Sequence, residues 1–273
     1  MSQRSRRRLP FLPRIPGNGH EPVSRDPTPT HPRTAFVLSG GASLGALQVG
    51  MLRALYERGI VPDFFVGASA GALNAAFVAC RPQTVDTIDE LARLWCTLRR
   101  EDVFPFGRRA LVAGLAGNGD HLVGDHGLRD LARRHLYIQR IEDAVVPLHL
   151  VTFDLVRGEE VLLSRGPALD AVLAAAAIPG LLPSVRWGTR RLVDGGVVNN
   201  TPISHAVALG AERVYVLPTA VIAGYEGKVD LVVMPAPNSH HVQPTDFRHS
   251  QRLIEGALTA AREFLGSAAM SAA

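Results

Sequence analysis

A serine between two glycines marks the point where an apolar strand becomes an Ala-rich helix in this 273-residue chain. The segment Gly67-Ala68-Ser69-Ala70-Gly71 follows the apolar run Phe64–Val66 and precedes a helical pattern that continues to Cys80. Small residues around Ser69 permit a sharp strand-to-helix turn, which exposes the serine hydroxyl near the positive end of the helix. Such a turn is typical of a nucleophilic serine, but it also occurs as an ordinary glycine-rich turn. The motif alone leaves both interpretations open.

The same order of strand, glycine turn and helix occurs one unit earlier. Residues 34–38 are apolar, Ser39-Gly40-Gly41 follows, and residues 44–57 carry apolar side chains at helical spacing. Two successive units of this kind predict an α/β fold with three layers, α/β/α, around a central and mainly parallel sheet. Other apolar runs predict strands at 148–154, 160–163, 191–193, 214–217 and 231–234, and helices at 84–98, 128–136, 167–177, 202–209 and 250–265.

Charge is unevenly distributed along the chain, whose formal net charge is +4. Residues 1–33 contain seven arginines and two acidic residues, so the remaining sequence is nearly neutral. This segment is also Pro-rich and lacks apolar periodicity, which predicts a disordered basic arm at 1–33 before one domain at 34–273. A solvated tail is the simplest interpretation of the arm, and transient contact with an anionic membrane surface is the alternative. Nucleic-acid binding is not expected.

The lengths of the apolar runs and the spacing of the cysteines bear on localisation and on metal binding. No apolar run is long enough to span a membrane, so we expect a cytoplasmic protein, at most peripheral to the inner face of the membrane. Cys80 and Cys96 lack metal-ligand spacing and are expected to be reduced thiols. The sequence predicts neither a metal nor another cofactor, and the oligomeric state stays open.

Three glycine-flanked elements fall at the predicted carboxyl ends of strands, where open α/β sheets bind their ligands. They are Gly40–Gly45, Gly67–Gly71 and Asp194-Gly195-Gly196. A serine nucleophile needs a base for its proton and fixed donors for the negative charge that forms on the substrate. Asp194 is the candidate base, since burial would raise the pKa of its carboxyl toward that of a useful proton acceptor. The amides of Gly40, Gly41 and Ala42 are the candidate oxyanion hole.

Four blocks of sequence together resemble the patatin-like phospholipases of bacterial type. The blocks are Ser39–Ala46, Gly67–Asn74, Ala174–Pro183 and Val193–Pro202. The resemblance implies a patatin-like domain and a serine acyl-ester hydrolase of lipids that forms an acyl-enzyme without a cofactor. Within it, Ser69 would be the nucleophile and Asp194 the proton acceptor. It also implies supporting residues, namely Gly67 and Gly71 at the elbow, Gly195 and Gly196 in the acid turn, and Gly40, Gly41 and Ala42 in the oxyanion loop.

Several alternatives remain open at this point. An acyltransferase would use the same acyl-enzyme, and a Ser-His-Asp α/β-hydrolase would take His205, His240, His241 or His249 as its base. A nucleotide-binding module is disfavoured because Ala42 replaces the second glycine of its phosphate loop and Asp63 begins, rather than ends, a strand. A regulatory protein that kept the fold without the chemistry is disfavoured by the presence of both Ser69 and Asp194. Asp125 and Asp154 are expected in turns or caps.

Overall fold

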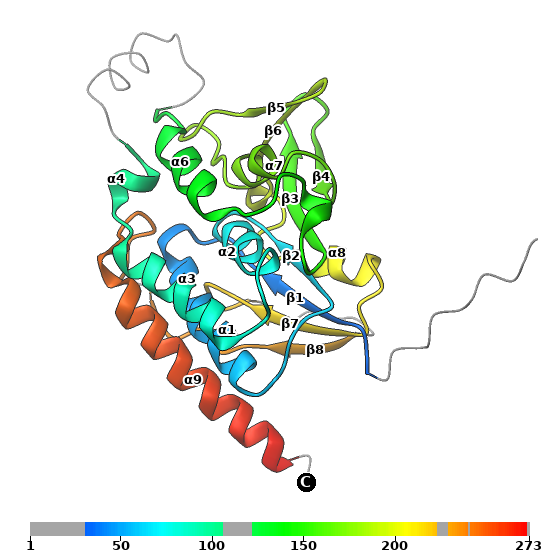
Figure 1. Cartoon of the computed structure of the whole chain (residues 1–273), viewed down its shortest axis with the longest axis vertical. Helices are drawn as coiled ribbons and strands as arrows, with labels where there is room; N and C mark the ends of the chain where they lie inside the picture. The colour runs from blue at the N-terminus through cyan, green and yellow to red at the C-terminus, as the bar shows by residue number, and fades with distance from the viewer. Residues whose placement is uncertain (1–30, 106–121, 223–228, 240, 272–273) are drawn as a thin grey trace, which may run out of the picture. The chain divides into compact units, whose positions relative to one another are not determined.

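The structure is a computed structural model that describes residues 31–105, 122–222, 229–239 and 241–271. The described residues from Pro32 onward belong to one compact unit (Figure 1). Residues 1–30, which make up most of the predicted arm, lie outside the described part, so the arm stays a prediction. None of the described helices is both long and apolar enough to cross a membrane.

A mixed sheet forms the centre of the unit. Among the described residues it has eight strands in the order β5-β6-β3-β2-β1-β7-β8, with β4 paired to β3. The strands are β1 (Thr34–Leu38), β2 (Phe64–Gly67), β3 (Leu148–Asp154), β4 (Glu159–Leu163), β5 (Val185–Trp187), β6 (Arg190–Asp194), β7 (Arg213–Leu217) and β8 (Asp230–Val233). Strands β1, β2, β3, β7 and β8 pair in parallel, whereas β4, β5 and β6 pair antiparallel. The predicted, mainly parallel sheet is confirmed.

Helices cover both faces of this sheet (Figure 1). The helices are α1 (Ala46–Glu57), α2 (Ala70–Ala79), α3 (Val85–Thr97), α4 (Arg100–Val103), α6 (His126–His135), α7 (Ala168–Ala175), α8 (Ile203–Ala208) and α9 (Ser250–Ser271). Short 3-10 turns occur at η1 (Ala42–Gly45), η2 (Ile141–Asp143), η3 (Gly195–Val197) and η4 (Phe247–His249). Helices α1, α2, α3 and α9 pack with one apolar core, and α8 packs with the other.

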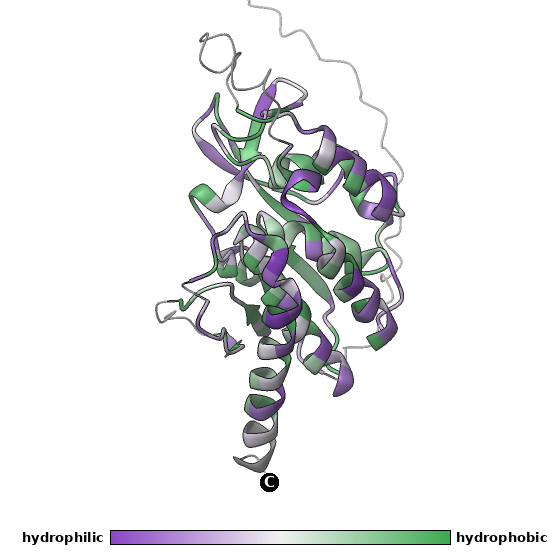
Figure 2. Cartoon of the chain, turned by 90° about the vertical axis from the view of Figure 1, so that its left-hand side faces the viewer, coloured by the Kyte–Doolittle hydropathy of each residue, from purple (hydrophilic) through white to green (hydrophobic). Residues whose placement is uncertain are grey.

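The alternation of side chains along β1 explains the three layers. Phe36 and Leu38 belong to the core beneath α1 and α2, whereas Ala35 and Val37 belong to the core beneath α8. Because both faces of a central parallel strand are buried, its sequence is apolar at every position. Figure 2 shows the same arrangement, with apolar residues along the central strands and many polar residues on the outer helices.

Strand β3 brings together two chain segments that are distant in sequence. Its residues Leu150–Asp154 pair with β4 along one edge, which leaves the other edge to β2 and β6. On that edge Gly67 of β2 lies opposite Leu150, and Asp194 of β6 lies opposite Thr152. Two residues along a strand span roughly 7 Å. The carboxyl ends of β2 and β6 therefore meet head to head, with Ser69 and Asp194 at the meeting point.

Candidate active site

Ser69 lies in the sharp turn between β2 and α2. Its backbone has φ 53° and ψ −126°, and its side chain is mostly buried. A positive φ is uncommon for a residue with a side chain and costs energy unless the surroundings hold it. Here the Ser69 amide donates to the carbonyl of Ala175 at 2.9 Å, so α7 helps to hold the turn. The strand-to-helix turn expected from the sequence is present.

The two glycines of the elbow are required by close packing. A Cβ added at Gly67 would lie 2.7 Å from the carbonyl oxygen of Gly71. A Cβ at Gly71 would overlap the carbonyl of Leu38 at the end of β1. These distances are shorter than van der Waals contact, so any larger residue would push α2 away from the sheet. The glycines thus let the helix begin directly above the strand ends.

Asp194 ends β6 and is 4% exposed. Its Oδ1 accepts a hydrogen bond from the Gly196 amide at 2.8 Å, and its own amide donates to the Ala177 carbonyl at 2.9 Å. Burial raises the pKa of the Asp194 carboxyl to about 6, although hydrogen bonds from the Ser69 hydroxyl and the Gly196 amide act in the opposite direction. The structure thus brings Ser69 and Asp194 together, and the carboxylate is a stronger proton acceptor than an exposed aspartate.

The oxyanion loop, defined here as Ser39–Gly45, approaches Ser69 from the end of β1. The Gly40 amide donates to the carbonyl of Asn200 at 3.0 Å, so this amide is already engaged. For the amides of Gly41 and Ala42, no hydrogen-bond partner occurs among the described residues. These two amides are therefore the ones available to a ligand.

Space explains why positions 40 and 41 of this loop are glycine and position 42 is alanine. A Cβ at Gly40 would lie 2.9 Å from Ser69 Cβ, and a Cβ at Gly41 would lie 2.5–2.7 Å from three side-chain atoms of Thr219. Ala42 instead lines the pocket beside Ser69. Ala42 still pays a conformational cost, because its φ is 50°, in the left-handed region that favours glycine.

Replacing Ala42 with glycine should raise the free energy of unfolding by up to about 1 kcal/mol. Relief of the left-handed strain, roughly 1–2 kcal/mol, exceeds the entropy gained by the unfolded chain, about 0.4–1 kcal/mol. Urea unfolding measures the difference. Ala46→Gly is the matched control, because Ala46 has φ −57° in a regular helical turn. This variant should lower the free energy of unfolding by about 1 kcal/mol or more. Equal destabilisation of both variants would contradict the strain at Ala42.

Ser69 opens onto a pocket whose walls are almost entirely apolar. Its lining comes chiefly from α2, α3 and α6, and it includes Leu73, Leu91, Trp95, Leu128, Val172 of α7 and Phe247. Among the described lining residues, the polar side chains besides the Trp95 indole are Ser69, Asn74 and His135. A cavity of this composition suits a hydrocarbon chain rather than a sugar or nucleotide.

The histidines considered as bases are held elsewhere. His205 Nε2 lies 2.7 Å from Glu160 Oε1 on the surface, and His249 lies 3.5 Å from Asp246. His241 hydrogen-bonds to Arg252, while His240 lies outside the described residues. None of the described histidines is hydrogen-bonded to Ser69 or Asp194. Among the described residues, the geometry therefore favours the carboxylate of Asp194 over these imidazoles as the candidate base.

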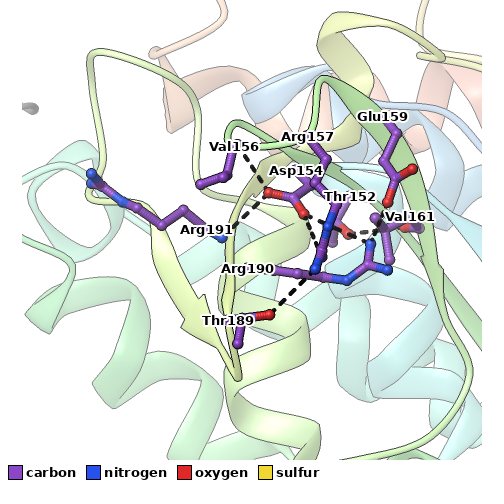
Figure 3. Close-up of polar contacts among 9 residues, drawn as sticks. All are labelled: Thr152, Asp154, Val156, Arg157, Glu159, Val161, Thr189, Arg190 and Arg191. Atoms are coloured by element: carbon purple, nitrogen blue, oxygen red, sulfur yellow. Dashed lines mark hydrogen bonds and ion pairs between the residues drawn. The ribbon is translucent and has the colours of Figure 1, made fainter.

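Asp154 ends β3 and accepts hydrogen bonds where β3, β4 and β6 meet (Figure 3). Its carboxylate accepts from the Val156 amide at 3.0 Å and from Arg157 Nη1 at 3.3 Å, and Arg190 lies 3.8 Å away. Burial alone would raise the pKa of Asp154, but backbone amides, including those of Val156 and Arg191, and the Arg157 charge hold it below its usual value. Asp125 likewise pairs with Arg129. The expected turn role of Asp154 agrees with the structure, whereas Asp125 stands at the N-cap position of α6 without a hydrogen bond from its side chain to the helix backbone.

Asn200, from the block Val193–Pro202, and Thr219, which lies outside the four blocks, complete the site. Asn200 accepts the Gly40 amide through its carbonyl and donates its side-chain amide to the Gly40 carbonyl at 3.3 Å, which ties the acid turn to the oxyanion loop. Thr219 Oγ1 also donates to the Gly40 carbonyl. Among the described residues, no group of three or more His, Cys, Asp or Glu side chains is placed to hold a metal ion.

Comparison with known proteins identifies relatives for most of this region. The family model described as "Patatin-like phospholipase" matches residues 36–207. An uncharacterized NTE family protein of Mycobacterium tuberculosis strain H37Rv is 31% identical over 173 residues, which cover 61% of this chain and 27% of the relative. Lysophospholipase NTE1 of Mycosarcoma maydis is 26% identical over 187 residues, which cover 68% of this chain and 10% of that protein.

Among solved structures, VipD from Legionella pneumophila matches with a TM-score of 0.43 and 15% identity, covering 74% of this chain and 49% of that chain. The curated relatives are much longer than the matched segment, which spans less than a third of either one. The family model, by contrast, matches more than half of the chain, including every residue of the candidate site from Gly40 to Asn200. The chain belongs to the patatin-like phospholipase family.

Proposed function

We propose that this chain hydrolyses carboxylic ester bonds of lipids, with Ser69 as the nucleophile and Asp194 as the general base. The observation that carries the proposal is the pairing of Ser69, at the end of β2, with the buried carboxyl of Asp194 at the end of β6. Burial raises the pKa of this carboxyl to about 6, although the Ser69 hydroxyl lowers it. Membership of the patatin-like phospholipase family and a relative named a lysophospholipase support the same activity. A carboxylate that is ionised near neutral pH, yet more basic than usual, suits removal of the serine proton.

The chemistry proceeds through an acyl-enzyme. Ser69 Oγ bonds to the ester carbonyl carbon while its proton moves to Asp194, and the carbonyl oxygen becomes an oxyanion that the Gly41 and Ala42 amides stabilise. The carbon–oxygen bond to the leaving alcohol then breaks, and the alcohol takes the proton from Asp194. Water repeats the sequence on the acyl-enzyme, giving a fatty acid and free Ser69. The amino end of α2, which begins at Ala70, favours the negative charge.

The pocket beside Ser69 is proposed to hold the acyl chain. Leu73, Leu91 and Trp95 are among its apolar side chains, and each methylene buried there contributes about 0.8 kcal/mol of binding free energy. Medium and long acyl esters should therefore bind more tightly than acetate esters. The basic arm at 1–33 is also proposed to contact an anionic membrane surface. Binding of the acyl chain in the pocket does not depend on this contact.

Release of fatty acid from defined esters tests the proposal. Purified protein is incubated with lysophosphatidylcholine and with p-nitrophenyl esters of increasing chain length, and the products are identified by mass spectrometry. Free fatty acid is the expected product, and addition of an alcohol acceptor separates hydrolysis from acyl transfer, since transfer would give a new ester instead. A folded protein that releases acid from none of these esters would contradict the proposal.

Replacing His205 with alanine should leave kcat/KM for ester hydrolysis within about twofold of wild type. The imidazole pairs with Glu160 on the surface and has no contact with Ser69, and exposed pairs of this kind contribute only about 0–1 kcal/mol to stability. Steady-state kinetics on the same esters measures the effect. A near-complete loss of activity in a folded His205→Ala protein would instead indicate a histidine base.

A further inference from the structure

Two buried amide side chains lie behind the oxyanion loop. Asn74 of α2 and Gln48 of α1 are 1% and 0% exposed. Asn74 Nδ2 donates to Gln48 Oε1 at 2.9 Å and to the Gly45 carbonyl at 3.0 Å. Asn74 therefore holds the end of the loop that leads into α1.

Gln48 holds the other end of the loop. Its Nε2 donates to the Ser39 carbonyl at 2.7 Å and to the Leu217 carbonyl of β7 at 3.1 Å. Buried polar groups that are fully hydrogen-bonded fix one arrangement, because leaving any of them unpaired costs about 1–3 kcal/mol. The two side chains together clamp both ends of the segment that carries the amides of Gly41 and Ala42.

The clamp is connected to the wall of the acyl pocket through Trp95. The Trp95 indole Nε1 donates to Asn74 Oδ1 at 2.8 Å, and the ring lines the pocket, where it stacks on Phe247 at 6.0 Å between centroids. Trp95 also packs directly against the loop, since a Cβ added at Gly45 would lie 3.0 Å from its ring atoms. An acyl chain in the pocket would therefore contact Trp95, which reaches the loop both through its hydrogen bond to Asn74 and through its packing against Gly45.

We propose that Trp95, Asn74 and Gln48 position the oxyanion loop and couple it to the acyl pocket, so that a long acyl chain raises kcat as well as lowering KM. The proposal rests on the hydrolase function described above. Interactions that strengthen only in the transition state change kcat, and the loop amides act there, on the developing oxyanion. An acyl chain packed on Trp95 restricts the motion of the indole ring. The restricted ring holds Asn74 and the loop in the arrangement in which the loop amides can donate to the oxyanion. These three are positioning residues, because none of them contacts the reacting atoms.

Gln48→Met tests the clamp, since methionine has a similar length but donates to neither carbonyl. The loop amides should shift, and displacements of about 1 Å can lower rates by about 10²-fold. We expect kcat to fall roughly 10- to 100-fold with KM changed by less than about threefold. Gln83→Met is the matched control: Gln83 Nε2 also donates to two carbonyls, those of Val78 and Arg81, both at 2.9 Å and away from the loop. Its kcat should equal that of wild type.

Trp95→Phe tests the coupling and remains informative if Gln48→Met fails to fold. Phenylalanine keeps a ring beside Phe247 but removes the donor to Asn74. In wild type, kcat for p-nitrophenyl decanoate should exceed kcat for the butyrate ester, and in Trp95→Phe the ratio should approach one. A wild-type kcat that does not depend on chain length, or a ratio unchanged in Trp95→Phe, would overturn the coupling.

The two proposals fail in different ways. A wild-type protein that hydrolyses none of the esters contradicts the hydrolase function itself. An active wild type, with Gln48→Met matching Gln83→Met in kcat, overturns the positioning role alone.

Discussion

Replacing Ser69 with alanine should lower kcat/KM for ester hydrolysis by roughly 10³- to 10⁶-fold, to near the detection limit of a p-nitrophenyl ester assay. Alanine removes the only oxygen that can form the acyl-enzyme in this mechanism, and loss of a nucleophilic serine has effects of this size in other hydrolases. The fold should be kept, because alanine retains the Cβ and the turn depends on the surrounding glycines and the bond to Ala175.

Ser250→Ala is the matched control for this loss. Ser250 is also buried, but it lies at the start of α9, outside the oxyanion loop, and its hydroxyl donates to the Phe247 carbonyl at 2.8 Å. It should keep most of the activity, since only a neutral hydrogen bond worth about 1 kcal/mol is removed. If Ser69→Ala retained a tenth or more of wild-type activity, another nucleophile would have to be sought.

Replacing Asp194 with asparagine should lower kcat by about 10²- to 10⁴-fold, the usual contribution of a positioned general base. Asparagine can still accept the Gly196 amide, so the acid turn is kept, but it cannot take the Ser69 proton. In wild type, kcat/KM should rise with pH through about 6 as the raised pKa of Asp194 predicts, because the base must be ionised to act. The pH profiles of wild type and Asp194→Asn are compared, and a wild-type profile flat between pH 5 and 8 would contradict Asp194 as the base.

The Asp194 carboxyl also makes stability depend on pH, but in the opposite direction to activity: activity rises with pH, whereas the free energy of unfolding falls. Its pKa is raised to about 6 in the folded protein, compared with roughly 4 in the unfolded chain. The folded state therefore binds this proton more tightly, so the contribution of Asp194 to stability is fully present below about pH 4 and is lost as pH rises through about 6. At pH 7.5, Asp194→Asn should be more stable than wild type by about 1–3 kcal/mol. Urea unfolding at pH 7.5 and 4.5 should show this advantage shrinking at the lower pH.

Local sequence predicts the elements of this site well because the turn chemistry is local. Glycines at 67 and 71 are needed where α2 passes directly over the ends of β2 and β1. Glycines at 40 and 41 are needed where the oxyanion loop meets Ser69 and Thr219. These requirements place glycines at recognisable positions in the sequence, and the buried strands appear in it as apolar runs. Both the central sheet and the glycine turns at the ends of its strands could therefore be expected.

Contacts between distant segments could not be predicted in the same way. The sequence indicates a strand at 191–193 but not that β6 runs antiparallel to β3 and meets β2 end to end. Strand β5, Val185–Trp187, was missed because it is short and its middle residue, Arg186, is exposed. Nothing local to Gln48 indicates its bond to the carbonyl of Leu217, 169 residues away. Engagement of the Gly40 amide by Asn200 also emerges only when the acid turn and the loop are seen together.

Ser69, activated by Asp194, is proposed to be the nucleophile of an acyl hydrolase. The sharpest test of this role is labelling with a fluorophosphonate probe, followed by mass-spectrometric identification of the modified residue. We expect one adduct on Ser69 in the wild type, slower labelling below about pH 6 and in Asp194→Asn, and no adduct in Ser69→Ala. An adduct on any other residue, or a folded wild type that takes no label, would contradict the account.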